Sequence, residues 1–367
     1  MAKRKTKKKF SKGLTVFLAI VLFLGGIAGG FWGYYQLSMP TDSDSLITGD
    51  LEIHFPELGN KYTGDCTYIK VGDVDVLIDA GSKTSSIPTL SAYLEEHMND
   101  DVIEYVIVTH AHEDHYAGFA TPENTDSLFD LFEVKTIIDF AQITDGKSSQ
   151  KMYNNYLRER TEEIEAGATH YTAAECIEDN NKIFPLGHGV ELEILDSYFY
   201  YEVAESENDH SVCTMIHSGD EHFLFTGDLE KEGEEKLVEM NDLPEVTLYK
   251  AGHHGSKTSS NDCLLEVIKP EIVTVCCCCG SSEYSDKSAS QFPTQAFVDR
   301  IAPYTDRVYV TTLCVDYEAD KVKSMNGNIV VTCNKDGVKV SCSDNDTVLK
   351  DTEWFKTNRD CPKAWAS

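Results

Sequence analysis

Four metal-binding side chains lie within six residues in the stretch Val106-Ile-Val-Thr-His110-Ala-His112-Glu-Asp114-His115. The apolar, β-branched residues that precede them are typical of a buried strand. Residues two apart in an extended chain point the same way, so His110 and His112 share a face. Asp114 and His115 follow where the chain turns, so the four donors can divide between two neighbouring cations. Imidazole and carboxylate ligands suit zinc, and also manganese or iron.

Further acidic and histidine residues directly follow or precede other predicted strands. They lie in the segments Leu77-Ile-Asp79-Ala-Gly81, Asn208-Asp209-His210-Ser211, Phe225-Thr-Gly-Asp228 and Lys250-Ala-Gly-His253-His254-Gly-Ser256-Lys-Thr-Ser259. Each segment alone is weak evidence, since Thr-Gly-Asp is an ordinary turn sequence and a lone aspartate often caps a helix or turn. Their order along the chain after the first stretch makes it more convincing that they belong to one metal site.

In this order the segments resemble the motifs of the metallo-β-lactamase superfamily, whose signature is HxHxDH. The resemblance covers roughly residues 50–342 and implies an α/β fold, a four-layer αββα sandwich with a dinuclear metal site. The NDxS and HHGSxxS elements are most similar to the C-terminal hydrolase domain of ComEC-type DNA-uptake proteins. They also resemble secreted enzymes that cleave phosphodiesters such as choline-phosphate esters.

The resemblance implies a role for each motif residue, with Asp228 as the ligand shared by both cations. The expected metal ligands are His110, His112, Asp114, His115, Asp228 and His253, with His210 as a further candidate. The expected catalytic residues are Asp114, Asp228, His254 and Ser256. The residues expected to support the ligands are Asp79, Asn208, Asp209, Ser211 and Lys250. Three alternatives stay open: His254 could replace His253 as ligand, and either His210 or Asp209 could bind the second cation.

Strands and helices are predicted to alternate along the chain. The expected strands are 67–71, 74–78, 102–108, 135–140, 190–195, 212–217, 223–226, 246–249, 272–276, 329–332 and 338–341. The expected helices are 88–98, 149–166, 231–240 and 263–268. Gly72-Asp73 predicts a hairpin between the first two strands. Residues 343–367 show little pattern and form a tail with no predicted structure.

The N-terminal segment predicts a membrane anchor. Residues 1–12 contain seven basic residues, and residues 13–35 contain no charged side chain. At a helical rise of about 1.5 Å per residue, such a stretch matches the thickness of a bilayer core. The positive-inside rule leaves the N-terminus in the cytoplasm and, after a linker over 36–49, a domain from residue 50 outside the cell membrane. A cleaved signal peptide followed by secretion is the alternative.

Charge limits the substrates that this domain can bind. Beyond residue 35 the chain carries 25 of its 32 basic residues and all 62 acidic residues, a net charge of −37. Such a surface repels long polyanions, so an extended nucleic-acid interface is not expected. A small or locally engaged phosphoester could still approach a cation centre.

The four consecutive cysteines, 276–279, end an apolar run. Neighbouring residues in a strand face opposite ways, so these thiols cannot converge on one ion, and they are expected to be buried hydrophobic residues.

The function expected from these features is hydrolysis by a membrane-anchored enzyme outside the cytoplasm. Two divalent cations, most naturally zinc, would activate a water molecule as hydroxide for attack on a phosphodiester, as in a phosphodiesterase or nuclease. Hydrolysis of a lactam or thioester by the same fold is one alternative. Metal-dependent binding at the cell surface without catalysis is another.

Overall fold

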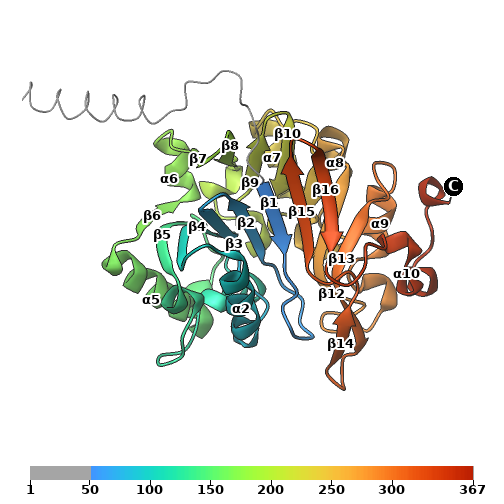
Figure 1. The fold of residues 1–367 in the computed structure, drawn as a ribbon, viewed down its shortest axis with the longest axis horizontal. Helices are drawn as coiled ribbons and strands as arrows, with labels where there is room; N and C mark the ends of the chain where they lie inside the picture. The colour runs from blue at the N-terminus through green and yellow to red at the C-terminus, as the bar shows by residue number, and fades with distance from the viewer. Residues whose placement is uncertain (1–50, 367) are drawn as a thin grey trace, which may run out of the picture. The chain divides into compact units, whose positions relative to one another are not determined.

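The computed structural model describes residues 51–366, which form two eight-stranded mixed sheets (Figure 1). The first sheet has the order β16-β15-β1-β2-β3-β4-β5-β6. Its strands are β1 (Leu51–Phe55), β2 (Thr67–Val71), β3 (Val74–Ile78), β4 (Val102–Val108), β5 (Glu133–Asp139), β6 (Thr169–Thr172), β15 (Ile329–Asn334) and β16 (Gly337–Cys342). The strands from β3 to β6 are parallel, and the others pair antiparallel.

The second sheet has the order β14-β13-β12-β11-β10-β9-β8-β7. Its strands are β7 (Ile183–Gly187), β8 (Val190–Ile194), β9 (Thr214–Ser218), β10 (Glu221–Phe225), β11 (Leu248–Lys250), β12 (Ile272–Cys279), β13 (Val308–Asp316) and β14 (Lys321–Ser324). The strands from β10 to β13 are parallel. Parallel strands need both faces covered, which agrees with the complete burial of β12.

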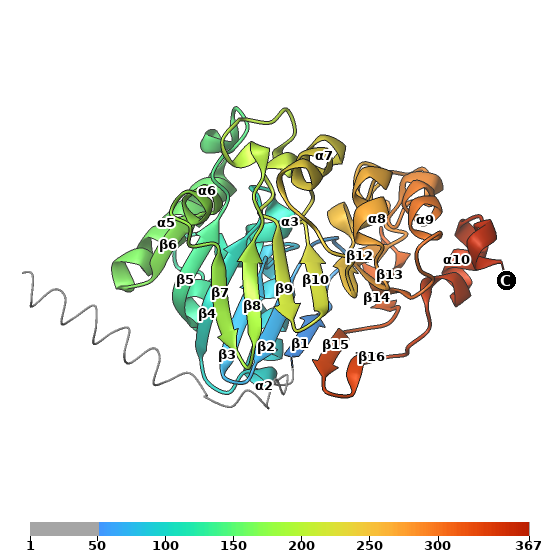
Figure 2. The ribbon, with the colours of Figure 1, turned by 90° about the horizontal axis from the view of Figure 1, so that it is seen from above.

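Helices cover the sheets on their outer faces (Figure 2). They are α2 (Ile87–His97), α3 (Glu113–Tyr116), α4 (Leu128–Leu131), α5 (Lys151–Ala166), α6 (Ala173–Glu178), α7 (Lys231–Met240), α8 (Asp262–Ile268), α9 (Gln295–Ile301) and α10 (Glu353–Asn358). One core lies mainly between the sheets and includes residues of α2 and α5. The other packs α7, α8 and α9 against the second sheet. The predicted layered sandwich of two mixed sheets and flanking helices is therefore confirmed.

The chain after residue 342 belongs to the second core. Leu349, Phe355 and Trp365 are buried in it, and α10 provides the second of these side chains. The segment without predicted structure therefore contains a packed helix.

The prediction for the four consecutive cysteines is confirmed. All four lie in β12 and are buried, with at most 3% of each residue exposed. Cys276 faces the core between the sheets, whereas Cys277 and Cys279 face the helices on the other side.

The predicted anchor at 13–35 and linker at 36–49 lie outside the described residues. Among residues 51–366, no helix has the length and apolar character needed to cross a membrane.

Candidate metal centre

Three loops that follow strand ends meet at one edge of the sandwich. The loop after β4 leads into α3, and the loops after β10 and β11 carry Asp228 and the His253-His254 pair. The His253 N–H donates to the Gly227 carbonyl at 3.1 Å and joins two of these loops, and the N–H of Val212, which precedes β9, donates to the Thr109 carbonyl of the third at 2.9 Å. Both sheets therefore contribute side chains to one place.

Asp228 lies at the centre of four imidazole rings. Its Oδ2 atom lies 3.1 Å from His115 Nε2, 3.5 Å from His254 Nε2, 3.8 Å from His253 Nε2 and 4.0 Å from His110 Nε2. One carboxylate within this distance of four ring nitrogens has the arrangement expected of a ligand shared by two cations.

The remaining donors extend this cluster on two sides. Asp114 Oδ2 lies 3.5 Å from His254 Nε2, and His112 Nδ1 lies 2.9 Å from His110 Nε2. The side chains therefore form two sets of possible ligands that share Asp228. One set contains Asp114, His115 and His254, and the other contains His110 and His112.

Several buried atoms of this cluster have no hydrogen-bond partner. They are His115 Nε2, His254 Nε2 and Asp228 Oδ1. Buried polar atoms are nearly always paired, so three orphaned donor atoms at one point indicate a missing ligand. The atoms of Asp65, His115, Asp228 and His254 that could bind a cation lie within 4.8 Å of one another. The residues present therefore fit a divalent-cation centre.

Asp79 is hydrogen-bonded to His115 on the side of the ring that faces away from Asp228. His115 Nδ1 donates to Asp79 Oδ2 at 2.7 Å, and the Thr109 N–H and hydroxyl donate to the same carboxylate at 2.8 and 2.7 Å. With Nδ1 engaged in this way, Nε2 of His115 is the nitrogen directed at Asp228. A carboxylate that fixes the tautomer of a metal-binding histidine is a common support for such ligands.

Asp65 lies beside a second histidine, and sequence reasoning missed it. Its Oδ1 atom lies 3.0 Å from His254 Nδ1, a nitrogen that is hydrogen-bonded to the Cys276 carbonyl at 3.0 Å. The Asp65 Oδ2 atom accepts a hydrogen bond from the Lys250 ammonium. All three side chains are at least 95% buried. Asp65 lies before a predicted strand without any motif around it, so only the folded chain reveals its role.

Two residues of the segment 208–211 contact side chains of the cluster around Asp228. The Ser211 hydroxyl accepts the Asp228 N–H at 3.1 Å and lies 3.4 Å from His110 Nδ1, so it supports two cluster residues. Asn208 Nδ2 lies 3.4 Å from His253 Nδ1. Both residues therefore lie against side chains of the cluster.

The same segment places His210 and Asp209 away from the cluster. His210 Nε2 accepts the Ala204 N–H at 2.9 Å, which leaves that nitrogen no lone pair for a cation. Asp209 Oδ1 accepts the Glu230 N–H at 2.9 Å at the start of α7. His210 Nδ1 faces Glu207 Oε1 at 3.6 Å, and neither His210 nor Asp209 belongs to the group of atoms that could bind a cation together with Asp228.

The turn after β11 directs His254 inward and His253 towards the rim. Both residues have left-handed backbone angles, with φ of 48° and 53°, so their rings diverge. The His254 side chain is 1% exposed, against 22% for His253, whose Nδ1 contacts the Thr258 hydroxyl at 3.1 Å. The geometry thus favours His254 as the ligand, the reverse of the preferred assignment. The Ser256 hydroxyl also contacts Thr258, at 3.0 Å.

Electrostatics in the cluster favour cations. Burial opposes protonation of His115 and His254, but Asp228 and a supporting carboxylate raise the pKa of each well above its ordinary value. The pKa of His110 is instead lowered, chiefly by burial. A cation that binds here would therefore displace protons from two histidines and meet a neutral third.

Two segments of the chain, residues 59–121 and 162–279, match the family model described as "Metallo-beta-lactamase superfamily". They include the loop after β4, Asp228 and His254, the residues that meet in the cluster. The chain belongs to the metallo-β-lactamase superfamily. The resemblance noted from the motifs is confirmed, and the fold is that of the metal-dependent hydrolases of this superfamily.

Curated relatives of this metallo-β-lactamase domain are competence and recombination proteins. Recombination protein 2 of Haemophilus influenzae is 27% identical over 30% of this chain and 13% of its own length. ComE operon protein 3 of Bacillus subtilis is 29% identical over 27% of this chain and 13% of its own. Competence protein ComA of Neisseria gonorrhoeae is 33% identical over 29% of this chain and 15% of its own length. The matched region thus spans about one seventh of each relative.

Among solved structures, the metallo-beta-lactamase fold protein YhfI from Bacillus subtilis is similar at a TM-score of 0.40. It is 10% identical, and the alignment covers 72% of this chain and 96% of that one.

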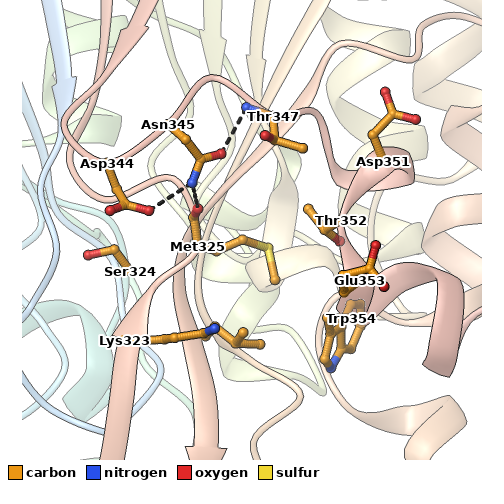
Figure 3. Close-up of a pocket in the computed structure, with 11 residues that line it drawn as sticks. Lys323, Ser324, Met325, Asp344, Asn345, Thr347, Asp351, Thr352, Glu353 and Trp354 are labelled. Carbon is orange, nitrogen blue, oxygen red and sulfur yellow. Dashed lines mark hydrogen bonds between the residues drawn. The ribbon is translucent and has the colours of Figure 1, made fainter.

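A large cavity in this metallo-β-lactamase fold is lined by residues outside the cluster around Asp228 (Figure 3). Its volume is about 620 Å³, and residues of β14, the segment 344–354 and Leu313 line it. The Asn345 side chain is held within the wall, donating to the Met325 carbonyl at 2.7 Å and accepting the Thr347 N–H at 3.0 Å. No lining residue coincides with a predicted site residue, so the cavity is separate from the chemistry.

Glu234 of α7 fixes the loop that follows the two histidines. Its carboxylate accepts the N–H groups of Ser260 and Asn261, at 2.5 and 2.9 Å, and the side-chain amide of Asn261 at 2.7 Å. The side chain is fully buried, and burial raises its pKa from 4.5 to about 7. The folded chain therefore holds this proton more tightly than the unfolded chain does. Its contribution to stability is complete below pH 4.5 and is lost as the pH rises through 7.

We expect Glu234→Gln to remove this pH dependence. Between pH 4.5 and 8 the unfolding free energy of the wild type should fall by about 3 kcal/mol relative to the variant. Denaturant unfolding in the presence of a chelator, at several pH values, measures the difference. Glu235→Gln, at the exposed neighbouring position, is the control and should follow the wild type. Parallel curves for the wild type and Glu234→Gln would contradict the prediction.

Proposed function

We propose that this chain is a phosphodiesterase that works with two divalent cations. The observation that carries the proposal is the buried cluster around Asp228, with four imidazoles near one carboxylate and three orphaned donor atoms. His110, His112, Asp114, His115 and His254 would hold the cations, with Asp228 shared between them. Zinc suits these ligands best, and manganese or iron also suit them.

The bound cations would supply a Lewis acid for the phosphoryl group and lower the pKa of a water molecule. The protein provides orientation. Asp79 fixes the tautomer of His115, the Cys276 carbonyl fixes that of His254, and Ser211 fixes the backbone of Asp228.

His253 is the residue placed to move a proton. Its ring lies at the rim, with Nε2 3.8 Å from Asp228 and Nδ1 3.4 Å from Glu230 Oε1. The Glu230 carboxylate lies beside Nδ1 and can orient the ring, so that His253 could give a proton to the departing oxygen of the ester. His254 and Ser256 were expected to stabilise the charge that develops on the phosphoryl oxygen or the leaving group, but the His254 side chain is buried and the Ser256 hydroxyl contacts Thr258.

The charge of the centre supports a phosphodiester over a neutral lactam or thioester. Asp65, Asp79, Asp114, Asp228 and Lys250 together carry three negative charges when ionised. Two divalent cations would leave one positive charge, which suits a monoanion such as a phosphodiester. The net charge of −37 beyond residue 35 favours a small or locally engaged ester, such as a cell-wall phosphodiester or a lipid headgroup, over a long polyanion.

Similarity to proteins named for competence and recombination is compatible with a phosphodiester substrate. The chain spans only 13 to 15% of those relatives, so their whole activity is not carried over. A membrane anchor at residues 13–35, with the catalytic domain outside the cytoplasm, remains part of this proposal.

The proposal is tested with bis(p-nitrophenyl) phosphate and the full-length protein in detergent, supplied with zinc or manganese. We expect turnover that a chelator abolishes, and a loss of at least about a thousandfold in Asp114→Ala, since a missing ligand costs several kcal/mol of transition-state stabilisation. Asp126→Ala, at an exposed position, is the control and should retain full activity. A folded protein with two bound cations and no turnover would exclude simple phosphodiesters and direct the search to thioesters and lactams.

A further inference from the structure

The loop between β12 and α9 lies over the metal centre. Glu283 ties it down, because its carboxylate accepts the Thr63 N–H at 2.8 Å. Farther along, the Phe292 ring lies 5.9 Å from the rings of both His253 and His254. The loop therefore forms one wall of the approach to the cluster.

Tyr284 of this loop combines exposure with a contact to the cluster. The residue is 57% exposed, among the highest values for large hydrophobic residues in the described chain. Its hydroxyl nevertheless donates to Asp114 Oδ2 at 2.9 Å, and its ring lies 5.6 Å from that of Phe292. An exposed ring gains little from burial, so the position of Tyr284 is better explained by what its hydroxyl can reach.

The hydroxyl lies at the solvent side of the centre. The Asp114 oxygen that it contacts also lies 3.5 Å from His254 Nε2, on the side where a cation fits. Asp114 would hold a cation through this oxygen, and the shared oxygen would then be a weaker acceptor for the phenol. The hydroxyl could donate to an oxygen of an arriving group instead.

We propose that Tyr284 is a substrate-binding residue whose hydroxyl donates a hydrogen bond to a phosphoryl oxygen held at the metal centre, with Phe292 supporting the ring. The proposal rests on the proposed function, since it assigns a donor to the same substrate class. A phenol keeps its proton at neutral pH and acts as a donor there. Tyr284 and His253 both lie beside the Phe292 ring, at 5.6 and 5.9 Å, so the phosphoryl group would meet the phenol in addition to the imidazole.

Binding of inorganic phosphate to the zinc-loaded, full-length protein tests this directly by calorimetry, without any need for turnover. Tyr284→Phe removes only the hydroxyl. We expect it to keep two zinc ions per chain and to bind phosphate about tenfold or more weakly, since hydrogen bonds to charged groups have this strength. The matched control is Tyr201→Phe, an exposed tyrosine whose hydroxyl contacts Asp196. The control should bind phosphate like the wild type.

Each other outcome overturns the inference in a recognisable way. Equal phosphate binding by wild type and Tyr284→Phe would show that the hydroxyl does not reach the substrate. Loss of a zinc ion in Tyr284→Phe would show that Tyr284 orients Asp114 instead. If the wild type binds phosphate but hydrolyses no ester, the proposed function fails, and the calorimetric comparison still decides the role of Tyr284.

Discussion

Replacement of Asp228 by asparagine should cost the chain at least one of its two cations and reduce turnover by about a thousandfold or more. The amide keeps the size of the side chain but removes its charge and one acceptor oxygen. Four ring nitrogens lie within 4.0 Å of the Oδ2 atom, so the substitution removes the carboxylate at the centre of the cluster. A loss of several kcal/mol of charge stabilisation corresponds to this rate factor. Elemental analysis and bis(p-nitrophenyl) phosphate turnover give the two measurements.

The control for this variant is Asp220→Asn, at an exposed turn between β9 and β10 of the same hairpin. It should retain both cations and full activity. If Asp228→Asn kept two tightly bound cations and its turnover, Asp228 would not be the shared ligand, and the arrangement of the whole centre would need revision.

Replacement of Lys250 by methionine should destabilise the fold by about 3–5 kcal/mol, the usual effect of removing one partner from a buried ion pair. The Lys250 ammonium and the Asp65 carboxylate are 3% and 5% exposed, so the aspartate would be left charged and without its partner. Unfolding by denaturant in the presence of a chelator measures this effect without a contribution from bound cations. Lys231→Met, in an exposed pair with Glu235, should leave the midpoint nearly unchanged.

A second change separates charge from packing. Asp65→Asn added to Lys250→Met removes the unpaired charge, so the double variant should recover part of the lost stability. The same double variant loses the carboxylate beside His254, and its zinc affinity should fall about 10- to 100-fold below that of the wild type. If the double variant were less stable than Lys250→Met, the ion pair would not be the source of the effect.

Local pattern predicts most of the sheet framework. All eleven expected strands overlap strands of the structure, because buried parallel strands such as β4 and β12 are long apolar runs. The short or partly exposed elements were missed, among them β1, β6 and α3. Such elements are stabilised by their neighbours rather than by their own sequence, so the sequence alone contains little evidence of them. The strand β13 was missed although its sequence is rich in valine and threonine.

The candidate site was predictable where several ligands share one short segment. Three residues depend instead on how the chain folds around them. Asp65 is paired with residues 185 and 189 positions away, so no local pattern can reveal it. His253 and His254 are adjacent, and only the left-handed turn decides which ring points inward. His210 lies in a short turn that directs its ring towards the Ala204 amide.

The division of the cluster between two sheets has a thermodynamic consequence. The loop after β4 belongs to the first sheet, whereas Asp228 and His254 follow strands of the second. Neither sheet alone offers a complete set of donors, so cations select the state in which the two sheets are docked. A higher concentration of free cations would then shift the equilibrium from separated to docked sheets, so bound cations would stabilise the fold in addition to taking part in catalysis.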